Sequence, residues 1–245
     1  MEGIDKRGIL RKWVDLPENM QKDEIRKYYE ILQRKRKSLF IKRLFDVVMA
    51  CLLLVVLSPA FLILAIAIRI DSKGSVFYRQ VRVTQYGRKF RIHKFRSMVN
   101  RADEKGSLVT VKGDGRITRV GRLIRDKRLD EIPQLIDVLQ GNMSFVGVRP
   151  EVPKYVMEYT PEMMATLLLP AGITNLTSIY YKDESELLEG VDDSEQVYIK
   201  QILPEKMKWN LKGIEEFGLC QEMRIMILTV FSMFKRNSND TTQEK

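Results

Sequence analysis

The chain has 245 residues, which allows one ordinary domain with appendages or two very small ones. Its 44% hydrophobic content lets it bury a core, whereas its formal net charge of +10 indicates an anionic partner such as nucleic acid, a lipid surface or a phosphorylated substrate. A single histidine, His93, excludes multi-histidine metal sites and argues against a serine–histidine triad, and two cysteines give no disulfide framework.

The first 43 residues are polar and basic, and they end in two groups of cations, Arg34 to Lys37 and Lys42-Arg43. The first thirty residues lack the apolar core of a signal peptide. We therefore expect residues 1–43 to form a basic N-terminal extension that remains on the side where it is synthesised.

An apolar run from Val47 to Ile68 is interrupted only by Ser58 and Pro59. It is long enough to cross a bilayer and lacks the polar stripe of a core helix in a soluble protein. Basic residues flank both of its ends, which favours a cytoplasmic location for both. We predict a re-entrant membrane helix over residues 44–70 that breaks at Ser58-Pro59, because proline removes a backbone hydrogen bond. A kinked single span is the alternative.

Residues 71–236 read as a small, mostly helical cytoplasmic domain with a short β-hairpin, so the fold class is α+β. Two strands are predicted at 76–83 and 89–98, around a turn at Tyr86-Gly87. Helices are predicted at 119–126, 130–139 and 219–234. Gly141-Asn142 is expected to cap the C-terminal end of the helix at 130–139. The helix at 219–234 is expected either to lie at the membrane interface as an amphipathic helix or to pack on the core. An acidic stretch at 183–195 is interpreted as a surface loop and 237–245 as a disordered tail.

The segment from Lys89 to Arg128 concentrates the positive charge, and it encloses one adjacent acidic pair, Asp103-Glu104. Neighbouring cations favour ionised carboxylates, and an ionised aspartate can attack phosphorus or hold a divalent cation. Adjacent Asp-Glu pairs are common, however, and a mixed-charge helix face explains most of them. Nucleic-acid binding is another reading, but the segment lacks the interleaved aromatic residues of single-strand binders. His93, in a strand, is interpreted as structural.

Short motifs occur in a fixed order between about Lys42 and Thr174. They are Lys42–Asp46, Ser58-Pro59, Ile70–Gly74, Lys94–Met98, Ala102–Gly106, Arg116–Arg119, Leu129–Leu135 and Gly141–Gly147. Each is weak alone, but the ordered set closely resembles the monotopic phosphoglycosyl transferases of the bacterial sugar transferase family.

The resemblance implies a UDP-sugar donor, Mg²⁺ and a polyprenyl phosphate acceptor such as undecaprenyl phosphate, at the bacterial inner membrane. It implies that Asp103 attacks the sugar-linked phosphate and expels UMP, leaving a covalent phosphosugar, and that Glu104 assists with the metal or a proton. Both carboxylates are therefore expected metal ligands. The candidates for phosphate contacts are Lys94, Arg96, Arg116 and Arg149. Asp130 and Glu131 would orient these arginines, although a role at a helix N-terminus explains the two carboxylates about as well. Pro150 is expected as a further supporting residue.

The sequence departs from the family pattern at Val148, where the family has proline, and from Pro170 to Asn175. The second region is expected to shape the sugar pocket, so the resemblance does not identify the sugar. A non-enzymatic membrane anchor binding anionic lipid or nucleic acid is the rival interpretation. It explains the charge and the apolar run but leaves the ordered motifs unexplained. The expected partners are the UDP-sugar donor, the polyprenyl phosphate acceptor and membrane lipid. We expect no binding to nucleic acid, and the sequence leaves homo-oligomerisation open.

Overall fold

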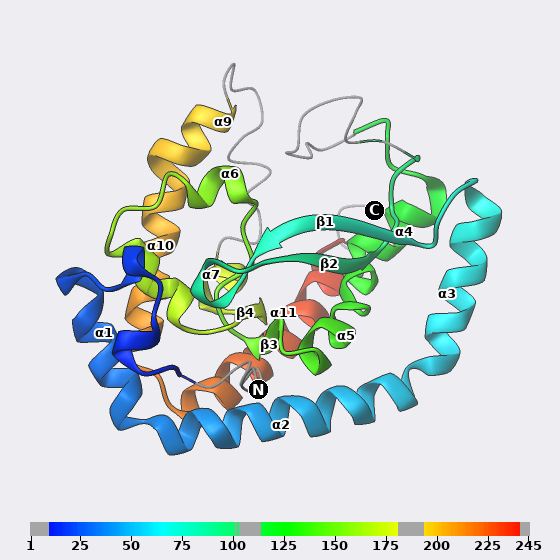
Figure 1. Cartoon of the computed structure of the whole chain (residues 1–245). Coiled ribbons are helices and arrows are strands. Elements are labelled where there is room, and N and C mark those ends of the chain that lie inside the picture. Colours follow the sequence, from blue (N-terminus) through cyan, green and yellow to red (C-terminus); the bar gives the residue numbers. More distant parts are fainter. Residues whose placement is uncertain (1–9, 101, 103–113, 181–193, 241–245) are drawn as a thin grey trace, which may run out of the picture.

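The computed structural model describes residues 10–100, 102, 114–180 and 194–240, in which helices surround two small two-stranded sheets (Figure 1). This confirms the α+β, mostly helical class. Asp103, Glu104 and nearly all of the predicted acidic loop lie outside the described residues. The larger helices are α1 (Asp23–Arg34), α2 (Arg36–Val56), α3 (Ser58–Asp71), α4 (Arg119–Asp126), α10 (Leu203–Glu215) and α11 (Leu219–Asp240). The shorter ones are α5 (Gln134–Leu139), α6 (Pro153–Val156), α7 (Leu176–Tyr180) and α9 (Ser194–Val197).

The apolar run forms two helices, α2 and α3, which meet at Leu57 with a bend of 63°. Pro59 lies in the first turn of α3, where the missing N–H costs nothing, so the break falls at the predicted Ser58-Pro59. In the described part of the chain no single helix is long and apolar enough to span a bilayer, whereas this bent pair satisfies length and composition together. Large apolar side chains are exposed along it: Leu44, Val48, Leu52, Val55, Val56, Leu62, Ile63, Ile66 and Ile70.

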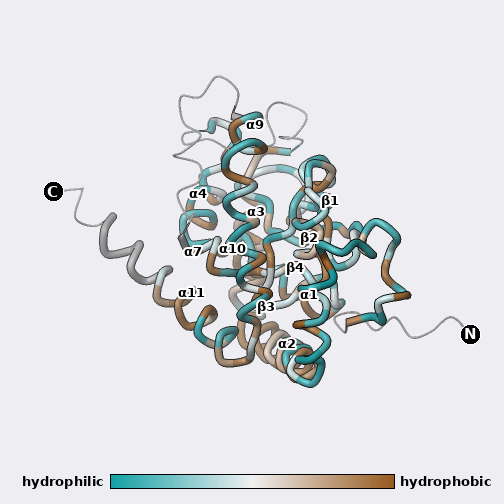
Figure 2. Tube along the Cα trace, turned by 90° about the vertical axis from the view of Figure 1, so that its left-hand side faces the viewer, coloured by the Kyte–Doolittle hydropathy of each residue, from teal (hydrophilic) through white to brown (hydrophobic). Residues whose placement is uncertain are grey.

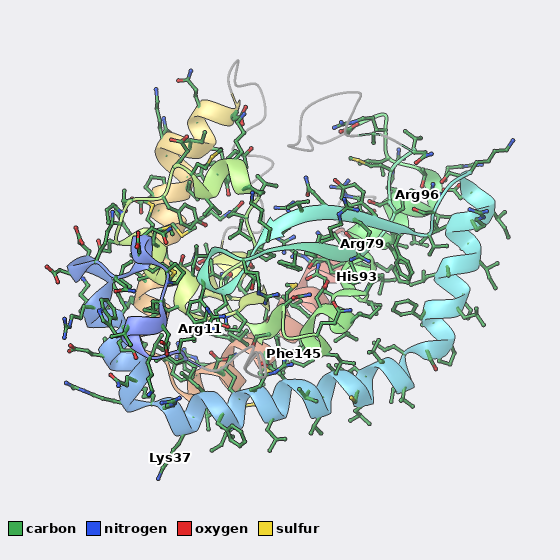
Figure 3. The ribbon with its side chains drawn as sticks, viewed as in Figure 1. Arg11, Lys37, Arg79, His93, Arg96 and Phe145 are labelled. Atoms are coloured by element: carbon green, nitrogen blue, oxygen red, sulfur yellow. The ribbon has the colours of Figure 1, made fainter. Side chains whose placement is uncertain are left out.

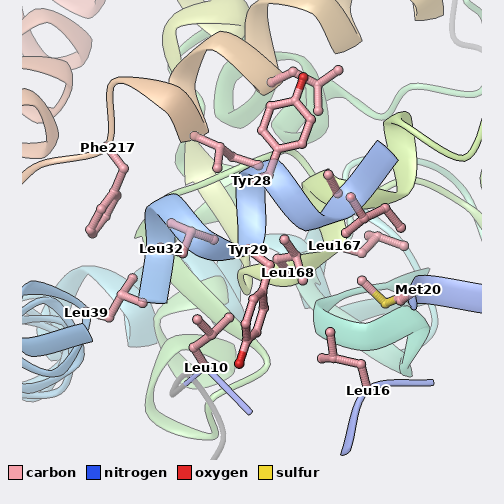
Figure 4. Close-up of a cluster of buried hydrophobic side chains, with 14 of the residues drawn as sticks. Leu10, Leu16, Met20, Tyr28, Tyr29, Leu32, Leu39, Leu167, Leu168 and Phe217 are labelled. Atoms are coloured by element: carbon pink, nitrogen blue, oxygen red, sulfur yellow. The ribbon is translucent and has the colours of Figure 1, made fainter. Parts of the chain in front are cut away.

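The segment before the apolar run packs into the protein. Leu10, Met20, Ile25 and Leu32 are buried together with residues of the 3₁₀ segment Met163–Leu168 and of α10 (Figure 4). The backbone N–H of Arg11 donates to Tyr86 Oη at 2.9 Å, so this segment also contacts the hairpin turn. Helix α2 is continuous across the predicted boundary at residue 43.

The predicted hairpin is confirmed as β1 (Phe77–Val83) paired antiparallel with β2 (Lys89–Phe95). Its turn contains two residues in the left-handed region, Tyr86 at φ 60° and Gly87 at φ 74°. Strand β2 ends three residues earlier than predicted, because the chain turns toward residues 116–118, where Val99 N–H donates to Arg116 O.

The predicted helix at 130–139 is divided into a 3₁₀ turn, Leu129–Glu131, and α5. Pro133 causes the division, since it has no N–H to continue the first turn. Gly141, at φ 73°, ends α5 as predicted: its N–H donates to Val138 O, and that of Asn142 donates to Asp137 O. The last predicted helix also differs, because α11 runs to Asp240, past the expected start of the tail at residue 237.

A second sheet pairs β3 (Met143–Val146) in parallel with β4 (Ala171–Thr174). Just beyond β3, Gly147 lies against Gly172 so closely that a Cβ on Gly172 would stand 2.1 Å from Gly147 N. Only glycine permits this approach, which fixes the direction in which the chain leaves β3 toward Arg149 and Pro150.

The motif Lys42–Asp46 anchors α2 to this sheet and to α5. Arg43 donates through Nη1 to Val138 O at 2.6 Å and through Nη2 to Leu139 O at 3.0 Å, which caps α5. Asp46 is buried and accepts from Ser144 Oγ at 2.8 Å and from Phe145 N at 3.2 Å. Lys42 donates to Val146 O at 2.8 Å and pairs with Glu222 of α11. Helix α2 is therefore anchored to the strand that leads to Arg149.

Candidate anion-binding site

Glu131 forms the centre of a charged cluster assembled from three parts of the chain. Its Oε1 accepts from Lys94 Nζ of β2 at 3.1 Å and from Arg149 Nη2, just after β3, at 2.6 Å. The Glu131 side chain is only 12% exposed. The structure thus brings together three of the residues to which the resemblance assigns a role, and the supporting role of Glu131 stays a prediction.

The electrostatics of this cluster favour an added negative charge. Burial opposes the ionisation of Glu131, but the charges of Arg149 and Lys94 outweigh it and hold the pKa of Glu131 below its usual range. Glu131 in turn raises the pKa of Arg149. Burial raises the pKa of Asp130, an effect that Lys94 opposes. The Glu131 carboxylate is thus shared by two cations, Lys94 and Arg149, and Arg149 uses only Nη2 in this contact, so its other N–H groups can bond a phosphate.

Arg82 is a third cation of the cluster, and it was missed in the sequence. Its Nη1 donates to Pro150 O at 3.1 Å and its Nη2 to Gln80 Oε1 at 2.6 Å, while its buried Nε has no partner among the described residues. Burial lowers the pKa of Arg82, and Glu151 opposes this effect. A signal was present: Lys94 pairs with Tyr78 across the hairpin, and Arg82, four residues later, lies on the same face.

Beneath the cluster, Glu151 connects the site to the helical part of the protein. Glu151 Oε1 accepts from Tyr198 Oη at 2.7 Å, and Tyr198 Oη lies 3.2 Å from Lys206 Nζ of α10. The carbonyl of Glu151 accepts from Val83 N at 2.9 Å. The peptide that carries Arg149 and Pro150 is therefore fixed from both sides.

Arg116 lies where the chain approaches Asp103. Its guanidinium pairs with Asp114 through Nε and Nη2, and its Nη1 donates to Ala102 O at 2.9 Å, one residue before the acidic pair. The hydrogen bonds from Arg116 lower the pKa of Asp114 to about 2, and Arg125 contributes in the same direction. Arg125 also lowers the pKa of Asp130, against the larger effect of burial, so its charge links this region with the Glu131 cluster.

Arg96 is not brought to the Glu131 cluster. It donates to Ser72 O at 2.6 Å and to Lys73 O at 2.9 Å, and it underlies Gly74, where a Cβ would stand 2.1 Å from its Nη1. Figure 3 shows Arg96 beyond the hairpin, beside the end of α3. The chain has already left β2 at Phe95, which turns Arg96 away from Lys94. Phosphate binding by these four cations remains a prediction.

His93 holds β2 in place. Its backbone N–H donates to Asp137 Oδ2 at 2.8 Å, and its Nδ1 lies 2.8 Å from Asp137 Oδ1. Its Nε2 lies 2.6 Å from Arg79 Nη1, which can only donate, so Nε2 accepts and Nδ1 carries the proton (Figure 3). Both ring nitrogens are therefore engaged in contacts that orient the strand carrying Lys94.

The described residues contain no group of three or more His, Cys, Asp or Glu that could hold a metal ion. The expected Mg²⁺ ligands, Asp103 and Glu104, fall outside these residues. Their chemistry fits the ion, because carboxylate oxygens are the protein ligands that Mg²⁺ prefers. Arg116 bonds the carbonyl that directly precedes this pair.

Comparison with known proteins relates the whole arrangement to one family. The family described as "Bacterial sugar transferase" matches residues 37–236. A UDP-glucose:undecaprenyl-phosphate glucose-1-phosphate transferase of Klebsiella pneumoniae is 32% identical over 205 residues, which cover 82% of this chain and 42% of that protein. One of the same name from Caulobacter vibrioides is 33% identical over 195 residues, covering 78% and 69%.

A third relative, a UDP-N-acetylgalactosamine-undecaprenyl-phosphate N-acetylgalactosaminephosphotransferase of Aeromonas hydrophila, is 42% identical over 124 residues, covering 51% of this chain and 29% of that protein. The chain thus spans less than half the length of the Klebsiella and Aeromonas relatives. The family match includes all of the ordered motifs and every member of the Glu131 cluster. The chain belongs to the bacterial sugar transferase family.

Proposed function

We propose that this chain transfers a sugar 1-phosphate from a UDP-sugar to polyprenyl phosphate, releasing UMP. The observation that carries the proposal is the cluster of Lys94, Arg149 and Arg82 around Glu131, in a chain whose relatives are named for this reaction. Phosphoryl transfer requires mainly positioning and neutralisation of charge, and cations held in place by a carboxylate supply both.

In the proposed mechanism a carboxylate oxygen of Asp103 forms a bond to the sugar-linked phosphorus, and the bond from that phosphorus to the oxygen of UMP breaks. An oxygen of polyprenyl phosphate then attacks the same phosphorus and releases Asp103, which gives a polyprenyl diphosphate sugar. Arg149 and Lys94 are proposed to hold the phosphate oxygens while charge redistributes. Mg²⁺, held by Asp103 and Glu104, would neutralise negative charge on the diphosphate. The product would serve as the substrate of glycosyltransferases that extend a lipid-linked glycan.

The nucleotide product tests this proposal directly. Membranes containing the protein, incubated with UDP-glucose or UDP-N-acetylgalactosamine and undecaprenyl phosphate, are expected to release UMP, and excess chelator should stop the release. Formation of UDP instead of UMP, or full activity in chelator, would contradict the mechanism. Absence of any nucleotide release across a panel of UDP-sugars would favour the non-enzymatic anchor.

We also propose that α2 and α3 enter the inner membrane and return, with the catalytic domain in the cytoplasm. The 63° bend, the exposed apolar side chains and the basic flanks support this. In a cysteine-free variant (Cys51→Ser, Cys220→Ser), we expect Val14→Cys and Met157→Cys, at two exposed positions, to react with an impermeant thiol reagent only after the cells are permeabilised. Labelling of Val14→Cys in intact cells, with Met157→Cys protected, would indicate a single span.

A further inference from the structure

A pocket lies between α10 and α11, beside the end of β3. Its walls include Val148, Trp209, Gly213, Ile214, Phe217 and Ile225, so it is lined mainly by apolar side chains. Helix α7 contacts both α10 and α11 and closes one side. The pocket takes no part in the charged contacts around Glu131, but Val148 in its wall directly precedes Arg149.

Four of the polar side chains in the pocket wall, those of Asn175, Thr177, Asn210 and Glu222, already have partners inside the protein. Asn210 Oδ1 accepts from Asn175 Nδ2 at 3.0 Å and from Thr177 Oγ1 at 2.9 Å. Glu222 pairs with Lys42 of α2. A sugar or a nucleotide base needs partners for most of its polar atoms when it leaves water, and beyond these four side chains the lining is mainly apolar, with Gln221 at its edge. The pocket therefore suits an apolar ligand.

Gly213 keeps this pocket open. It lies within α10, where alanine would be favoured by up to about 1 kcal/mol. Among the described residues, and apart from its chain neighbours and the nearby backbone of α10, no atom lies within 4 Å of the position that its Cβ would occupy, so the space beside it could accept a side chain. Neither crowding nor a left-handed backbone requires glycine here, and a larger side chain at this position would take up space in the pocket that Gly213 lines.

The position of the pocket indicates what occupies it. Helix α11, which forms one wall, exposes Met223, Ile227, Val230 and Phe231 on its other side and is tied to α2 through Glu222. Figure 2 shows α11 at the left edge of the described chain, with brown, apolar positions among its turns. The pocket thus has the exposed apolar side of α11 on one side, and its wall residue Val148 directly precedes Arg149 of the Glu131 cluster. An amphiphile with a phosphate head and an apolar tail matches both neighbours.

We propose that the pocket binds the first isoprene units of the polyprenyl phosphate acceptor, next to its phosphate. The phosphate would lie at Arg149 and Lys94, and the chain would pass Val148 into the pocket before it reaches the lipid. This inference rests on the proposed transfer to polyprenyl phosphate and adds the place where that substrate is recognised. Burial of isoprene carbons supplies binding free energy in proportion to the apolar area covered.

Substitution of Gly213 tests the inference in the full-length, detergent-solubilised protein. Gly213→Leu should fill the pocket and raise the KM for undecaprenyl phosphate about tenfold, as expected when one or two methylene contacts are lost. Gly213→Ala should raise it less. The kcat/KM for the UDP-sugar at saturating acceptor should stay within about twofold, because the cation cluster is untouched. Lys208→Leu, on the exposed side of α10, is the matched control and should change neither constant.

A second measurement keeps the test decisive if the leucine variant folds poorly. A photoreactive farnesyl phosphate, added to the wild-type protein, should crosslink to peptides of α10 and α11 that line the pocket. An unchanged acceptor KM in Gly213→Leu, or crosslinks confined to α2 and α3, would overturn the inference while leaving UMP release intact. Loss of UMP release in the wild type would instead refute the proposed function itself.

Discussion

Asp103→Asn is expected to lower turnover by at least about a thousandfold, because an amide is nearly isosteric with the carboxylate but cannot attack phosphorus. The expectation rests on the family, now shown for this chain, and on Arg116, which bonds the carbonyl preceding Asp103. Turnover would be measured as UMP release with undecaprenyl phosphate present. Glu104→Gln should also lower the rate strongly, because it removes a carboxylate from the expected Mg²⁺ site.

The matched control is Asp126→Asn, which removes an exposed carboxylate from the same basic segment. It should retain full turnover. Membrane association and the circular dichroism spectrum should be the same for all three variants and the wild type. If Asp103→Asn kept substantial turnover under these conditions, Asp103 would be a surface charge and the proposed nucleophile would have to be sought elsewhere.

Arg149→Ala is expected to lower kcat/KM for the UDP-sugar by about a hundredfold, the cost of losing a charge-assisted contact of roughly 3 kcal/mol to the transferred phosphate. Arg149 is the residue that Glu131 holds most closely, at 2.6 Å. Arg149→Lys should recover part of the activity, since lysine keeps the charge but cannot offer two parallel N–H groups.

The effect on stability should be much smaller than the effect on activity. The Arg149 side chain is 37% exposed, so solvent screens its pairing with Glu131, and the free energy of unfolding should fall by about 1 kcal/mol. Arg122→Ala, which removes an exposed arginine from α4, should leave both quantities unchanged. A loss of activity in Arg149→Ala no greater than in Arg122→Ala would show that the Glu131 cluster does not bind the donor.

Features controlled by neighbouring residues could be predicted from the sequence. The hairpin, the bounds of α4, the glycine cap at Gly141 and the break at Ser58-Pro59 each depend on a turn residue, a cap or a proline. The division at Pro133 could have been predicted by the same rule, but the apolar spacing of residues 130–139 was given more weight.

Features that depend on distant contacts could not be predicted in this way. The packing of residues 10–34 against α10 requires partners well over a hundred residues away, so the sequence of this segment indicates only that it is polar and basic. In the sequence Arg82 resembles any solvent-facing arginine on a strand, because its contact with the Pro150 carbonyl depends on the fold. Arg96 is part of a matching motif, yet its contacts are the carbonyls of Ser72 and Lys73. The ordered motifs identified the family, whereas the role of each cation depends on the fold.

Asp103 is proposed to carry the phosphosugar between donor and acceptor. Wild-type protein, incubated with its UDP-sugar and Mg²⁺ in the absence of polyprenyl phosphate, should gain the mass of one sugar phosphate. The adduct should map to the peptide containing Asp103, with one UMP released per protein, and addition of undecaprenyl phosphate should remove it. Asp103→Asn should gain no mass. An unmodified wild-type protein that releases UMP only when the acceptor is present would contradict the covalent mechanism and indicate direct transfer.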